Sequence, residues 1–130
     1  MDNIGIRKDL RASYEDTLVA VPAALREEGF GVLTEIDVAQ TLKQKIDVDF
    51  RRYKILGACN PTFAHRVLSL QLDAGVMLPC NVIVYERDGG GATVIAVDPM
   101  QTIAAQVGGE LEKIAREVRA KLERVVARLA

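Results

Sequence analysis

Two cysteines are the residues of this sequence best suited to chemistry, and each lies in a distinctive local context. Cys59 belongs to a Gly-Ala-Cys-Asn-Pro segment, and Cys80 belongs to a Leu-Pro-Cys-Asn segment. Asn60 is a favoured helix N-cap and Pro61 suits the first helical position, so a helix is predicted to begin there. Unpaired backbone N–H groups at a helix start favour an anion, which would give Cys59 enhanced thiolate character.

The two cysteines are expected at neighbouring strand ends, Cys59 at the exit of one strand and Cys80 at the entrance of another. If these strands pair in antiparallel fashion, both sulfurs come to the same end of the sheet. The functional interpretation is a redox pair or a set of thiolate ligands. The alternative is two well-packed thiols without a function, because free cysteine is among the most buried residue types. No Cys-x-x-Cys motif is present to favour redox chemistry.

His65, the single histidine, is a candidate both for metal binding and for cysteine catalysis. A tetrahedral zinc site needs four ligands. Cys59, Cys80 and His65 are candidate metal ligands, and a two-fold interface could supply what is missing. A cysteine nucleophile needs a base nearby, and His65 follows Cys59 by only six residues. Nothing in this spacing fixes the geometry, so a partly exposed helix residue is the other interpretation of His65.

Glu35 and Asp37 are the remaining candidates, two residues apart on a predicted strand and therefore on one face. They could act as paired carboxylates in ligand or metal binding. The alternative is a solvated strand end in which they form ion pairs with Lys43 or Lys45.

The elements that must position these residues follow from hydrophobic periodicity and turn signals. Pro22 falls inside the first helix and predicts a kink or two short pieces. The C-terminal helix carries an apolar stripe, interpreted as core or dimer contact, after an interruption at Gly108-Gly109. The predicted strands are 3–10, 30–37, 53–58, 82–85 and 93–97, and the predicted helices are 13–29, 38–46, 61 to about 74, and 110–130.

This order of elements, with a hairpin through 88–91, predicts one α+β domain spanning residues 1–130. Its two layers would be a mainly antiparallel sheet and helices packed on one face of it. With 130 residues, 49% of them hydrophobic, the chain can bury a core without disulfides or metals.

The composition also limits which binding partners and which cellular location are expected for this protein. Seventeen basic and 18 acidic residues give a net charge of −1, which argues against nucleic-acid binding. No apolar run reaches the length of a membrane span and no signal peptide is visible, so a cytoplasmic location with reduced thiols is expected.

Several sequence blocks together resemble the domain-of-unknown-function family numbered 302. They are Gly29 to Val38, Lys45, Ile55 to Pro61 with Ala64-His65, Leu78 to Val82, and Val97-Asp98-Pro99. The resemblance covers nearly the whole chain and implies a fold similar to that of the TATA-binding protein, commonly as a homodimer. The family's recurring residues fall on Glu35, Asp37, Cys59, Asn60, Pro61, Pro79, Cys80 and Asn81. The resemblance carries no established activity, and a shared fold does not imply DNA binding.

The leading hypothesis is a small homodimeric cytoplasmic domain that binds a small ligand or metal ion near Cys59 and Cys80. Asn60 would order the helix start, and Glu35 and Asp37 are secondary candidates. A thiol-redox or cysteine-dependent enzyme is one alternative, and an interaction module without a site is another.

Overall fold

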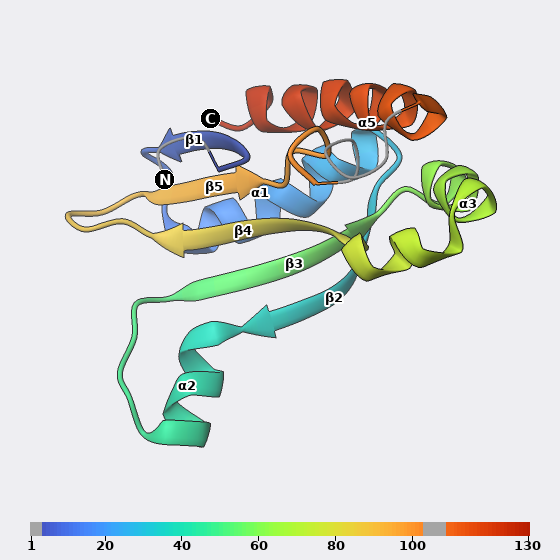
Figure 1. Ribbon diagram of the computed structural model, residues 1–130. Helices are drawn as coiled ribbons and strands as arrows, with labels where there is room; N and C mark the ends of the chain where they lie inside the picture. Colours follow the sequence, from blue (N-terminus) through green and yellow to red (C-terminus); the bar gives the residue numbers. More distant parts are fainter. Residues whose placement is uncertain (1–3, 103–108) are drawn as a thin grey trace.

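Five strands form one antiparallel sheet in the order β1-β5-β4-β3-β2, seen in the computed structural model of Figure 1. The structure describes residues 4–102 and 109–130. The strands are Ile6–Leu10 (β1), Gly31–Asp37 (β2), Tyr53–Cys59 (β3), Cys80–Glu86 (β4) and Ala92–Ala96 (β5).

The helices connect and cover these strands, which confirms the predicted α+β architecture. No described helix is both long enough and apolar enough to cross a lipid bilayer. The helices are Tyr14–Glu27 (α1), Val38–Ile46 (α2), Pro61–Leu70 (α3), the 3₁₀ helix Leu72–Met77 (η1) and Gly109–Ala127 (α5).

Of the two alternatives at Pro22, the structure excludes two short pieces, because Pro22 lies inside one continuous α1. Several predicted boundaries need correction. The helix after Cys59 ends at Leu70, because Gln71 adopts extended backbone angles before η1 begins. The first strand begins at Ile6, since Gly5 turns the chain with a φ of 70°. The Gly108 half of the predicted interruption lies outside the described residues.

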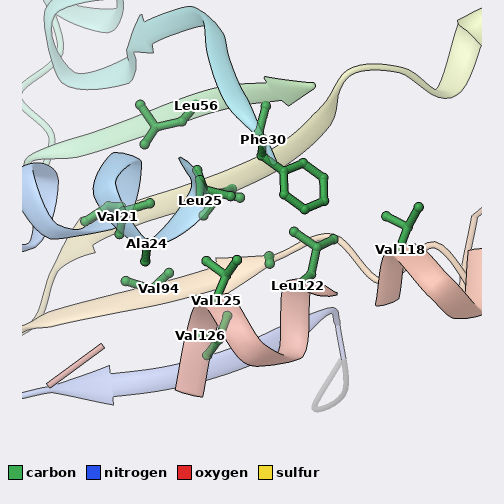
Figure 2. Close-up of a cluster of buried hydrophobic side chains, with 14 of the residues drawn as sticks. Val21, Ala24, Leu25, Phe30, Leu56, Val94, Val118, Leu122, Val125 and Val126 are labelled. Carbon is green, nitrogen blue, oxygen red and sulfur yellow. The ribbon is translucent and has the colours of Figure 1, made fainter. Parts of the chain in front are cut away.

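The core lies between one face of the sheet and the pair α1 and α5. Figure 2 shows apolar side chains of both helices gathered over the strands. The predicted stripe of α5 is fully used in this packing, so it belongs to the core. Its members Leu111, Ile114, Val118, Leu122, Val125 and Leu129 are each at most 6% exposed.

One buried carboxylate fastens the end of α1 to α5. Glu28 is 8% exposed and accepts hydrogen bonds from Arg124 at 3.0 Å and Arg128 at 2.6 Å. These bonds, from Arg124 first, hold the pKa of Glu28 below its ordinary value. A buried charge needs such partners, so these two hydrogen bonds fix how α5 lies against α1.

Gly57 marks a close approach at the cysteine end of the sheet. A Cβ at this position would contact the Thr34 hydroxyl and lie 2.8 Å from Cγ of Pro79. By contrast, a Cβ added at Gly31, on the neighbouring strand, would meet nothing within 4 Å.

We therefore expect Gly57→Ala to lower the free energy of unfolding by about 1–3 kcal/mol, the usual cost of overpacking. Gly31→Ala is the matched control and should change it by less than about 1 kcal/mol. Urea unfolding followed by circular dichroism measures both. Equal effects of the two substitutions would contradict the close approach at Gly57.

Candidate functional site: an apolar cavity beside the cysteines

An apolar cavity lies where the ends of β3 and β4 meet α3 and α5. The space that the centre of a water-sized sphere can reach inside it is about 50 Å³, and all the space between its lining atoms, open solvent at the mouth included, is about 490 Å³. None of the described residues that line it is charged. The lining consists of Phe30, Ala58, Cys59, Asn60, Phe63, Ala64, Val67, Leu78, Pro79, Cys80, Pro99, Ile114, Ala115 and Val118.

Antiparallel pairing of β3 with β4 brings both cysteines to this end of the sheet, as the sequence predicts. The register sets Cys80 opposite Ala58, the residue before Cys59. The two thiols share the wall of one cavity, but both are free and they do not form a close pair. The expectation of a cysteine pair is therefore wrong, because the register sets Cys80 opposite Ala58 and not opposite Cys59.

The side chain of Asn60 connects two of the elements around the cavity through hydrogen bonds. Its amide oxygen accepts a hydrogen bond from the Phe63 backbone N–H at 3.4 Å, which confirms it as the N-cap of α3. Its amide nitrogen donates to the Glu28 carbonyl at 3.3 Å. Asn60 therefore ties α3 to the end of α1, where the Glu28 side chain is held by α5.

A second link between α3 and α5 lies next to the cavity. Arg66 forms an ion pair with Glu117 at 3.0 Å. The Arg66 guanidinium also lies 5.4 Å from the ring centroid of Phe63, and the Lys121 ammonium lies 6.0 Å from it. These cations hold Phe63 between the two helices, with their charge outside the cavity.

Burial dominates the electrostatics of Cys80. Loss of solvent, with a smaller contribution from the Cys59 charge, raises the pKa of the Cys80 thiol to about 11. At neutral pH this thiol is protonated, and a protonated thiol is neither a nucleophile nor a metal ligand. The expected thiolate character of Cys59 stays a prediction.

The candidate metal ligands are not assembled by the fold. His65 is exposed on α3 and does not line the cavity. Within residues 4–102 and 109–130, no three side chains of the metal-binding types gather as a site would require. Cys59, Cys80 and His65 therefore do not form the predicted ligand set in the described chain.

Glu35 and Asp37 lie away from the cysteines. Gly31 is the β2 residue paired with Cys59, and Asp37 stands six residues further along β2, a distance of about 20 Å. Glu35 forms an ion pair with Lys54, so the expected partners Lys43 and Lys45 are wrong. Asp37 caps α2 by accepting from the Gln40 N–H at 2.9 Å. The ion-paired and capping roles explain both carboxylates.

Much of the cavity wall was not predicted from the sequence. Phe63 lies on the predicted helix that begins at Pro61, but its spacing from Cys59 did not mark it as part of a site. Pro99 and Ala115 come from distant segments, and no local pattern connects them with the cysteines. Only the packing of α5 against α3 reveals that they share one cavity.

Comparison with known proteins places the chain in a family. A family model described as domain of unknown function DUF302 matches residues 6–129, nearly the full length. The chain belongs to the DUF302 family. A solved structure titled as an uncharacterised conserved DUF302 protein from Bacillus stearothermophilus has the same fold. It is 29% identical with a TM-score of 0.86, and the match covers 95% of this chain and 96% of the other. No curated protein matches the chain.

The raised pKa of Cys80 predicts how stability depends on pH. The folded state holds the Cys80 proton up to about pH 11, whereas an unfolded thiol releases it near pH 9. The unfolded state then binds fewer protons, so stability falls as pH rises through this window. Cys80→Ala should remove part of that fall, by an amount of at most a few kcal/mol.

Urea unfolding at pH 8 and pH 10.5 measures this difference. Tyr14, whose pKa burial raises to about 12, affects both proteins equally and cancels in the comparison. The same pH dependence in the variant and the unmodified chain would contradict a buried, protonated Cys80.

Proposed function

We propose that this DUF302 protein is a small binding domain, and that its ligand is a small uncharged molecule held in the cavity between α3 and α5. The proposal rests on the lining of this cavity, which is apolar except for two thiols and the Asn60 amide. Ligand sites are usually concave, mainly apolar and supplied with a few polar groups that orient the ligand.

The charge of the ligand follows from the groups that face it. An ion placed in this cavity would lose its hydration and find no opposite charge among the lining residues. The amide of Asn60 is already bonded to Phe63 and Glu28. The thiols of Cys59 and Cys80 remain as the weak polar contacts available to a neutral ligand.

The same features weigh against the two chemical alternatives. A metal ion would need further ligands and deprotonated thiols. A dithiol redox cycle requires two sulfurs that can bond, whereas the cysteines here are free and offset in register. Because two free thiols persist in a reducing compartment, we place the protein in the cytoplasm.

Filling the cavity tests the proposal. Ala115 is 2% exposed and lines the cavity on α5, whereas Ala120 lies exposed on the same helix. Ala115→Leu should displace a bound ligand, and Ala120→Leu is its matched control. Indole serves as a neutral probe, with benzoate and Zn²⁺ as charged probes.

Each probe is titrated into the protein, and two-dimensional amide NMR spectra give its dissociation constant. We expect indole to shift the amide signals of Cys59, Phe63 and Ala115, with weak binding in the millimolar range typical of fragments. Ala115→Leu should weaken binding about tenfold or more, and Ala120→Leu should leave it unchanged. Indole binding that Ala115→Leu leaves intact, or tighter binding of either charged probe at these residues, would overturn the proposal.

A further inference from the structure

The segment between β3 and β4, residues 60–79, leaves the sheet and returns to it at neighbouring positions. β3 ends at Cys59, β4 begins at Cys80, and the sheet pairs Cys80 with Ala58. Figure 1 shows α3, which lies within this segment, at the end of the sheet where β3 finishes. Because both ends of the segment lie side by side, α3 and η1 can move away together without breaking a strand pairing.

Few side chains of this segment are anchored in the core. The buried residue of α3 is Val67, and that of η1 is Ala74. By contrast, α5 buries seven residues. Leu72 and Val76 of η1 are 82% and 90% exposed. Segments with few buried apolar contacts open at a lower free energy than the core does, so residues 60–79 are expected to open before the sheet unfolds.

The contact between α3 and α5 holds this segment in place. Apart from η1, the main packing partner of α3 is α5. The ion pair between Arg66 and Glu117 joins the two helices, and its side chains are 43% and 51% exposed. Exposed ion pairs contribute little to stability. The two helices therefore separate more easily than the paired strands do.

The same segment forms the side of the cavity that faces solvent. The cavity residues of α5 are buried, and so are Phe30, Ala58 and Pro99. Of the lining residues that the structure describes, those that reach solvent all lie within residues 59–80. They are Cys59, Asn60, Phe63, Ala64, Leu78, Pro79 and Cys80. A molecule that enters the cavity must therefore pass this segment.

We propose that residues 60–79 form a lid, which opens the cavity by separating from α5 while the sheet stays intact. The structure shows the closed position, in which Phe63 and Val67 of the lid line the cavity. The role of the lid in admitting a ligand rests on the proposed function, whereas the opening itself does not.

Native-state hydrogen exchange, followed by NMR at urea concentrations below the unfolding transition, tests the opening. We expect the amides of α3 to be protected at least tenfold less than those of β3 and β4, because α3 exchanges through a partial opening. Arg66→Gln should speed the exchange of α3 about two- to fivefold, the usual effect of losing an exposed ion pair, and leave the strands unchanged. Arg116→Gln is the matched control, because Arg116 pairs with Glu112 at 2.9 Å within α5.

Alkylation of Cys80 by iodoacetamide, a small neutral reagent, shows whether this opening exposes the cavity. A Cys59→Ser chain leaves Cys80 as its single thiol. In that chain, Arg66→Gln should raise the alkylation rate by the same factor as the exchange of α3, and Arg116→Gln should leave the rate unchanged.

Circular dichroism first establishes that each variant is folded. Protection of the α3 amides equal to that of β3 and β4, or a Cys80 alkylation rate that Arg66→Gln leaves unchanged, would overturn the lid. Neither measurement uses a ligand, so a failure of indole to bind would overturn the proposed function alone.

Discussion

The burial of only one face of the sheet is the constraint on which the rest of this structure depends. Two helices, α1 and α5, cover a single face of five strands, and their apolar residues account for nearly half of the core. Hydrophobic burial is the dominant favourable term in folding, so the long stripe of α5 must lie on this face. The candidate cavity lies at the border of that contact.

The cavity is a consequence of how α5 is held. Glu28 fastens α5 to the end of α1, and the carbonyl of the same residue accepts from Asn60 at the start of α3. The sheet ends, α3 and α5 thus meet around a volume that apolar side chains line without filling. Because the cations around Phe63 stay outside this volume, the cavity combines a dry wall with two neutral or weakly polar sulfurs. This combination favours an uncharged ligand over an ion.

How far the sequence predicts this molecule depends on the range of the forces involved. The cap at Asn60, the strand of Cys59 and the stripe of α5 were predicted because local hydrogen bonding and periodicity determine them. Antiparallel pairing also followed, and it correctly brought the cysteines to one end of the sheet. The one-residue offset between them did not follow, because register depends on turn geometry and on packing across several strands. The ion pair of Glu35 with Lys54 did not follow for the same reason, since Lys54 comes close only through the pairing of β2 with β3. The capping role of Asp37 is local, because Gln40 lies only three residues further on. That these two carboxylates take part in a ligand site stays a prediction.

We infer that the volume between α3 and α5 is a dry site for an uncharged ligand. A crystal of the full chain pressurised with xenon tests it most directly, because xenon enters apolar cavities and is located by its anomalous scattering. We expect a xenon atom among Cys59, Phe63 and Cys80. Ordered water filling this volume, or a metal ion bound by the two sulfurs, would contradict it.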